Sequence, residues 1–132
     1  MSKILIVDDD QTIVSIWSMA LKTENFEVIT ASSGKDGIEK AKNNHPDFIL
    51  LDQIMPDIKG NDALRALKQD SETANIPVAI ASKYSENQMM QDAINAGAVD
   101  YIMKYQIEPS DLIVKIKSLM QGEINKNPNP NP

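Results

Sequence analysis

The stretch Ile4-Leu5-Ile6-Val7-Asp8-Asp9-Asp10 joins a short apolar run to three consecutive acids. An uninterrupted apolar run is typical of a strand in a parallel sheet, which is buried on both faces. A second run of this kind, Phe48-Ile49-Leu50-Leu51, leads to Asp52. In open α/β sheets, ligands bind beyond the carboxyl ends of the strands. The two acidic strand ends therefore predict a site for a divalent metal and a phosphoryl group.

Strand and helix patterns alternate along the chain. Strands are predicted at residues 4–7, 26–31, 48–51, 76–81 and 99–103. Helices are predicted at about 12–23, 61–69, 86–96 and 109–120, and a further helix starts at Ser33 and carries Ile38 and Ala41. In the first helix, Ile13, Ile16, Trp17, Ala20 and Leu21 share a face that we expect to point inward. We predict an α/β, flavodoxin-like (βα)5 doubly wound fold, with a parallel sheet in the order 2-1-3-4-5 and helices on both faces.

Composition and charge exclude several classes of protein. The 132 residues contain no cysteine and one histidine, so thiol chemistry and metal sites with two histidine ligands are excluded. The net charge of −6 argues against direct binding of nucleic acid. No segment resembles a signal peptide or membrane span, so we expect a cytoplasmic protein. We predict one domain at residues 1–122 and a disordered Asn/Pro-rich tail at residues 123–132.

In the predicted strand order the first and third strands are neighbours, so Asp8, Asp9 and Asp52 would share one crevice. Clustered carboxylates repel one another unless one is protonated or a cation binds. Hard oxygen ligands with room for water favour Mg²⁺. Lys104 follows the fifth strand and Ser82 follows the fourth, where they could contact a phosphoryl group on a carboxylate.

With these residues assembled, the chain resembles the receiver domain of two-component response regulators, especially the stand-alone chemotaxis (CheY-like) type. The resemblance extends from Lys3 to about Gln121. Besides the acids of the first strand, it is carried by Ser82 and by the segments Leu50-Leu51-Asp52-Gln53-Ile54-Met55-Pro56-Asp57-Ile58-Lys59-Gly60 and Gly97-Ala98-Val99-Asp100-Tyr101-Ile102-Met103-Lys104.

The resemblance implies that Asp52 accepts a phosphoryl group from a histidine kinase or a histidine phosphotransfer protein. It implies Mg²⁺ (or Mn²⁺) bound by Asp9, Asp52 and the backbone carbonyl of Ile54, with Asp8 acting through water. Lys104 would pair with the phosphoryl group. Ser82 and Tyr101 would be the switch residues, and the surface of the fourth helix, fifth strand and fifth helix would contact an unknown downstream protein.

Further expectations follow from the same resemblance. The chain would catalyse only its own phosphorylation and dephosphorylation and would not be an enzyme in the usual sense. It would be a monomer or a phosphorylation-dependent dimer, with no membrane partner and no cofactor site besides the metal.

The chain departs from the family pattern at several positions. Tyr105 stands where the family usually has a cis proline, and we predict a trans bond because a non-proline cis bond costs about 2.5–4 kcal/mol. The loop after Lys104 is expected to be one residue longer than usual. Lys83 and Tyr84 would modulate access to the site, and Ile54 and Tyr84 replace polar residues that often help water attack. We therefore expect a long-lived acyl phosphate.

Three alternatives stay open at this stage. The first is a haloacid-dehalogenase-like phosphohydrolase with Asp8 as nucleophile and Asp10 as acid/base, because Asp8-Asp9-Asp10-Gln11-Thr12 fits its DxDxT motif. The second is a flavin-binding module of the same topology, although three acids would repel a flavin phosphate. The third is a receiver-like interaction module that works without phosphorylation.

Overall fold

A computed structural model describes residues 1–122, so the predicted tail at residues 123–132 lies outside the described residues. The strands are β1 (Lys3–Val7), β2 (Glu27–Ala31), β3 (Phe48–Asp52), β4 (Val78–Ser82) and β5 (Asp100–Met103). The helices are α1 (Gln11–Thr23), α2 (Gly34–Asn44), α3 (Gly60–Gln69), α4 (Asn87–Asn95) and α5 (Pro109–Met120). None of these helices is both long and apolar enough to span a bilayer.

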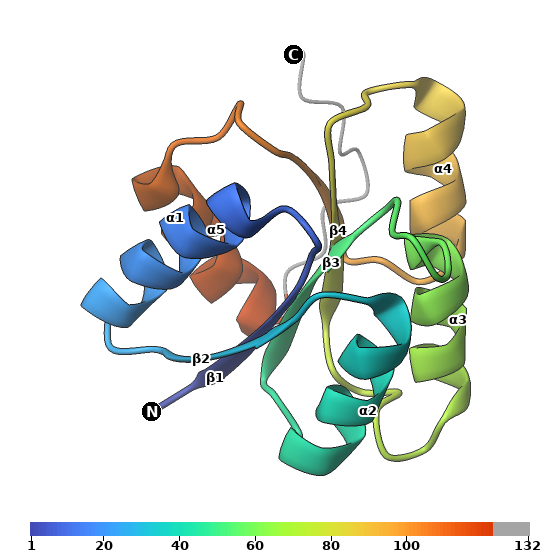
Figure 1. The fold of residues 1–132 in the computed structure, drawn as a ribbon, viewed down its shortest axis with the longest axis horizontal. Helices are drawn as coiled ribbons and strands as arrows, with labels where there is room; N and C mark the ends of the chain where they lie inside the picture. Colours follow the sequence, from blue (N-terminus) through green and yellow to red (C-terminus); the bar gives the residue numbers. More distant parts are fainter. Residues whose placement is uncertain (123–132) are drawn as a thin grey trace.

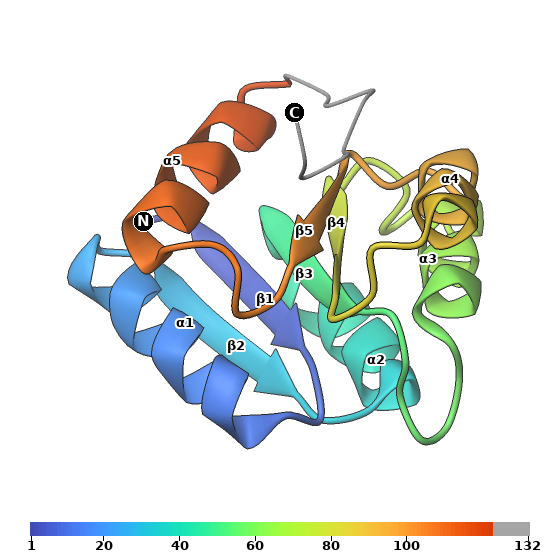
Figure 2. The same ribbon diagram turned by 90° about the horizontal axis from the view of Figure 1, so that it is seen from above.

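The strands form one parallel sheet in the order β2-β1-β3-β4-β5, which confirms the predicted topology. Helices α1 and α5 cover one face, and α2, α3 and α4 cover the other (Figures 1 and 2). Successive strand residues point to opposite faces. Accordingly Ile4 and Ile6 belong to the core beneath α1 and α5, whereas Leu5 and Val7 belong to the core beneath the other helices.

The register of the sheet brings the strand ends to one edge. Val7 lies beside Leu51, Asp52 beside Ala81, and Ser82 beside Met103. Asp8, Asp52, Ser82 and Lys104 therefore stand at the same carboxyl edge because each is the last residue of a strand or the one that follows it.

Some boundaries and one buried residue were predicted wrongly. Strand β4 begins at Val78 instead of residue 76, because Pro77 has no N–H for the ladder, and it includes Ser82. Ile16 was expected to face inward but is 42% exposed. It lies beside Pro109 and Ile113 in an apolar surface groove between α1 and α5, where α5 does not cover it.

Two side chains hold the loops at this edge. The Asp10 carboxylate accepts hydrogen bonds from the backbone N–H groups of Thr12 and Ile13 and thereby caps α1. Asp57, in the loop between β3 and α3, accepts hydrogen bonds from the N–H groups of Gly34 (3.0 Å) and Lys35 (2.9 Å) at the start of α2.

Gly60 starts α3 directly against the end of β3. A Cβ atom at this position would lie 2.3 Å from the Asp52 carbonyl oxygen and 2.8 Å from the Gln53 Cα. Both neighbours are backbone atoms and cannot move alone. Gly60→Ala is therefore expected to lower the free energy of unfolding by about 2 kcal/mol or more, as measured by urea titration. The exposed Gln69→Ala change in the same helix serves as the control and should stay within about 0.5 kcal/mol of the parent; equal effects would contradict this account.

Candidate metal and phosphoryl site

Three carboxylates meet at the ends of β1 and β3. Oxygen atoms of Asp8, Asp9 and Asp52 lie within 4.8 Å of one another. Asp8 is 1% exposed and Asp52 is 6% exposed, whereas Asp9 is exposed. Such a set of hard oxygen donors, open on one side to water, fits Mg²⁺ or Mn²⁺. The chemistry of the donor set thus agrees with the predicted metal site.

A buried lysine neutralises part of this cluster. The Lys104 Nζ lies 2.7 Å from Asp8 Oδ2 and 2.9 Å from Asp52 Oδ1, and the residue is 3% exposed. Its backbone N–H donates to the Ser82 carbonyl, which anchors the end of β5 to the end of β4. Burial disfavours the charge of Lys104, but its hydrogen bonds to Asp8 and Asp52 outweigh this and raise its pKa.

Asp52 is not an ordinary aspartate. Burial raises its pKa to about 7, aided by the charges of Asp8 and Asp9 and opposed by its hydrogen bond to Lys104. A carboxylic acid with this pKa is about half protonated at neutral pH, and a bound cation would favour its charged form. Cation binding and deprotonation of Asp52 are therefore coupled.

The coupling predicts how Mg²⁺ affinity varies with pH. Because Mg²⁺ binds the carboxylate and not the acid, its affinity is expected to fall about tenfold between pH 8 and pH 6 as Asp52 takes up a proton. Isothermal titration calorimetry at several pH values measures this. Asp52→Asn has no such proton, so it should bind Mg²⁺ weakly with little change over the range. An affinity of the parent chain that does not vary with pH would contradict the prediction.

A small pocket gives access to the cluster. It has a volume of about 210 Å³ and is lined by Asp9, Asp10, Asp52, Ile54, Ser82, Lys83, Tyr84 and Lys104. Ile54 is 52% exposed and Tyr84 is 47% exposed, so two bulky side chains stand at its rim. Asp8 does not line the pocket, which leaves Asp52 as the buried carboxylate that a ligand can reach.

Ser82 and Tyr101 are connected through one loop residue. The backbone N–H of Tyr84 donates to Ser82 Oγ at 2.9 Å, and the Tyr101 hydroxyl donates to the Tyr84 carbonyl at 2.6 Å. Tyr101 is 2% exposed, so its ring is already buried in this structure. Ser82 Oγ and the Tyr101 hydroxyl are therefore linked through the backbone of Tyr84.

One contact of the site was not anticipated. The Tyr105 hydroxyl donates to Asp10 Oδ2 at 2.5 Å, which joins the loop after β5 to the loop after β1. This hydrogen bond holds the pKa of Asp10 below its usual value. Tyr105 has φ +64°, and no peptide bond within residues 1–122 is cis, which confirms the trans bond after Lys104.

Comparison with known proteins agrees with this geometry. A profile of the response regulator receiver domain family matches residues 4–117. The response regulator ArlR of Staphylococcus saprophyticus is 35% identical over 128 residues, which are 96% of this chain and 56% of that protein. ArlR of Staphylococcus aureus is 32% identical over 127 residues, with the same two shares. The chain therefore spans little more than half the length of these curated relatives.

Solved structures give the same result. A CheY-like response regulator receiver domain protein from Methanospirillum hungatei JF-1 superposes with a TM-score of 0.86 at 30% identity, covering 93% of this chain and 96% of that one. The chemotaxis response regulator CheY4 of Vibrio cholerae gives 0.84 at 26% identity, covering 90% and 98%. Taken with the matched profile and the acidic cluster at the sheet edge, these likenesses show that the chain belongs to the response regulator receiver domain family.

Proposed function

We propose that Asp52 accepts a phosphoryl group, in the cytoplasm, from the phosphohistidine of a histidine kinase or histidine phosphotransfer protein. The observation that carries this proposal is the position of Asp52, which lines the open pocket while one of its oxygens is paired with the buried Lys104. Asp9, Asp52 and the Ile54 carbonyl would hold Mg²⁺ or Mn²⁺, and Asp8 would act through water. When bound, the ion would offset negative charge on the carboxylates and the transferring group.

In the proposed step, an Asp52 carboxylate oxygen forms a bond to phosphorus. The bond from phosphorus to the histidine nitrogen breaks, and its electron pair stays with the imidazole. The product is an acyl phosphate on Asp52, which water later hydrolyses to carboxylate and inorganic phosphate. Lys104 stabilises the charge on the phosphoryl oxygens during both steps.

The response would pass through Ser82 and Tyr101. A phosphoryl group on Asp52 adds acceptor oxygens that the Ser82 hydroxyl can approach. Since Ser82 and Tyr101 are already joined through Tyr84, a shift of Ser82 would alter the surface of α4, β5 and α5. We propose that a downstream protein binds there.

Locating the modified residue tests the proposal. The chain is incubated with acetyl phosphate and Mg²⁺, reduced with borohydride, which converts an aspartyl phosphate to homoserine, and mapped by mass spectrometry. Homoserine at position 52 supports the proposal. Homoserine at position 8, with turnover of a phosphoester, would establish a phosphohydrolase instead. No modification at all would contradict both and favour an interaction module that works without phosphorylation.

The structure disfavours Asp8 as the nucleophile. Its Oδ1 accepts a hydrogen bond from the Asp10 N–H at 2.9 Å, and its Oδ2 is 2.7 Å from Lys104 Nζ. Both oxygens are thus engaged, and the residue is 1% exposed. A nucleophile needs a free oxygen in line with the donor, which Asp8 does not offer.

The rim of the pocket predicts the lifetime of the acyl phosphate. Ile54 has no polar side-chain atom and Tyr84 is a bulky ring without the carboxylate that a general base needs, so the double variant Ile54→Asn/Tyr84→Glu is expected to dephosphorylate about tenfold faster than the parent. The measurement follows release of inorganic phosphate from the purified phosphorylated chain. The matched variant Ile54→Leu/Tyr84→Phe keeps the bulk of the rim without adding an amide or a carboxylate and should decay at the parent rate. Little or no acceleration in the polar variant would rule out this explanation.

A further inference from the structure

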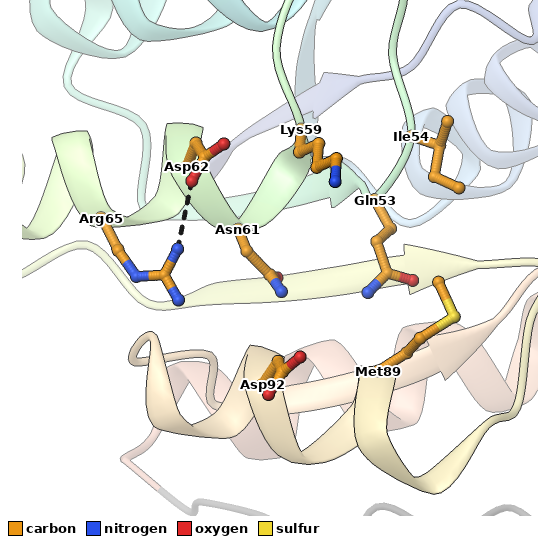
Figure 3. Close-up of a pocket in the computed structure, with 8 residues that line it drawn as sticks. All are labelled: Gln53, Ile54, Lys59, Asn61, Asp62, Arg65, Met89 and Asp92. Carbon is orange, nitrogen blue, oxygen red and sulfur yellow. Dashed lines mark hydrogen bonds and ion pairs between the residues drawn. The ribbon is translucent and has the colours of Figure 1, made fainter.

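Gln53 lies between the phosphoacceptor and a second cavity. This cavity is a groove of about 360 Å³ between α3 and α4, lined by Gln53, Ile54, Lys59, Asn61, Asp62, Arg65, Met89 and Asp92. Figure 3 shows the Gln53 side chain pointing from the end of β3 toward Met89 on α4. Gln53 is only 5% exposed, and a buried amide of this kind is normally hydrogen-bonded.

The backbone of Gln53 is fixed on both sides. Its N–H donates to the Ala81 carbonyl at 3.1 Å, and its carbonyl accepts from the Gly60 N–H at 2.7 Å. Gln53 also follows Asp52 directly in the chain. Its side chain therefore leaves the sheet edge from a constrained position next to the reacting carboxylate.

The Gln53 amide meets the Tyr101 hydroxyl. Gln53 Oε1 lies 2.8 Å from the Tyr101 oxygen, which is also 2.6 Å from the Tyr84 carbonyl. A hydroxyl has one proton and can donate to only one of these two acceptors. Both contacts are satisfied when the amide is turned so that its NH₂ donates to the Tyr101 oxygen while the hydroxyl donates to Tyr84, because the two ends of an amide have nearly the same shape.

We propose that Gln53 is a positioning residue that holds the Tyr101 ring in its buried position before any phosphorylation. Its amide donates to the Tyr101 oxygen, which in turn donates to the Tyr84 carbonyl. The role of Tyr101 as a switch rests on the proposed function, but the bond from Gln53 does not depend on a metal or a phosphoryl group.

The bond has a consequence for the switch. A buried hydrogen bond between neutral groups favours the state that contains it by a factor of about three to ten. The unphosphorylated chain is thereby shifted toward the buried Tyr101 state by this factor. Phosphorylation can then convert only the smaller fraction of molecules whose Tyr101 ring is still exposed.

The test measures the exposure of the Tyr101 ring in solution. The full chain is labelled with ε-¹³C tyrosine. The broadening of each tyrosine ring signal by a soluble gadolinium chelate is then recorded by NMR, without Mg²⁺ or phosphodonor. The parent chain should show one protected ring, Tyr101, beside the exposed rings of Tyr84 and Tyr105. In Gln53→Leu the exposed population of Tyr101 is expected to rise about three- to tenfold. Gln53→Met, which keeps the length and bulk of the side chain without its amide, should act in the same way if the leucine variant folds poorly.

Two controls separate positioning from a general loss of structure. Gln69→Leu makes the same chemical change on the exposed surface of α3 and should leave the Tyr101 ring protected. In a double-mutant cycle with Tyr101→Phe, which removes the hydroxyl, the effects of the two changes on stability should be non-additive. The side-chain NH₂ resonances of Gln53 should also shift in Tyr101→Phe. Unchanged Tyr101 exposure in both Gln53 variants, additive effects, or unchanged amide resonances would each overturn the proposal.

A second arm keeps this inference apart from the proposed function. Mg²⁺ and fluoroberyllate, a mimic of an acyl phosphate, are added to the same labelled samples. If Gln53→Leu loses the protection of Tyr101 and fluoroberyllate restores it, both the role of Gln53 and the proposed function are supported. Loss of protection in Gln53→Leu with no change on addition of fluoroberyllate supports the role of Gln53 and contradicts the proposed function. Full protection of Tyr101 in Gln53→Leu, together with shifts of the Tyr101 resonances on addition of fluoroberyllate, contradicts only the role of Gln53.

Discussion

Asp52→Asn is expected to reduce phosphorylation by acetyl phosphate by at least about 100-fold, because an amide is a far weaker nucleophile than a carboxylate. The reaction is run in saturating Mg²⁺, and its rate is measured by phosphate-affinity gel electrophoresis. Asp57→Asn is the matched control, since Asp57 lies in the loop after β3 but binds the start of α2 instead of facing the cluster. It should be phosphorylated at the rate of the parent chain. A variant at position 52 that is still labelled at the parent rate would exclude Asp52 as the acceptor.

The same substitution has an effect on stability whose sign follows from the Asp52 pKa. Folding raises this pKa to about 7, so the folded chain holds the Asp52 proton more tightly than the unfolded chain does. The contribution of Asp52 to the stability of the metal-free parent should therefore fall as the pH rises from about 4 to about 7. Asp52→Asn lacks this proton, and its advantage in Tm over the parent should be larger at pH 8 than at pH 5 in the presence of a chelator. An equal difference at both pH values would contradict the raised pKa.

Lys104→Met is expected to slow phosphorylation of Asp52 by about 100-fold while Mg²⁺ binds several-fold more tightly. The first effect arises because the variant lacks the buried cation that would stabilise the transferring group. The second arises because one positive charge is removed from a cluster of three carboxylates. Loss of Lys104 also leaves Asp8 and Asp52 uncompensated, so the rates are measured in saturating Mg²⁺, with folding checked by circular dichroism.

Lys83 provides the control for this experiment. It lines the same pocket as Lys104 but is exposed, and water and salt screen its charge. Lys83→Met should therefore change the phosphorylation rate by no more than about threefold. Equal losses in the two lysine variants would show that net charge at the pocket matters and that the buried position of Lys104 does not.

Much of this structure could be predicted because it depends on local pattern. The apolar runs before Asp8 and Asp52 are buried strands, and the alternation of strands and helices leaves few possible sheet orders. The strand order then determines that Asp8, Asp9 and Asp52 meet. Positions fixed by the backbone ladder were thus accessible from the sequence.

Contacts between side chains from distant loops could not be predicted from the sequence. The hydrogen bond of Tyr105 to Asp10 spans 95 positions, and that of Tyr101 to Gln53 spans 48. Each depends on the path of a loop and on a rotamer, and neither leaves a periodic pattern in the sequence. Ile16 was misplaced for a related reason, because the helical period shows which residues share a face but not how far α5 extends over that face.

The Asp10 carboxylate serves two elements at once, since it supports the first turn of α1 and also accepts the Tyr105 hydroxyl from the loop that leads into α5. A protein that pulled this loop away would remove the Tyr105 hydrogen bond and leave the Asp10 carboxylate with the N–H groups of Thr12 and Ile13 alone. If binding of such a protein to the loop changed the affinity of α1 for a second protein, then the second protein, bound to α1, would change the affinity of the loop for the first by the same factor. Two proteins bound to these separate surfaces would then alter each other's affinity for the chain without touching.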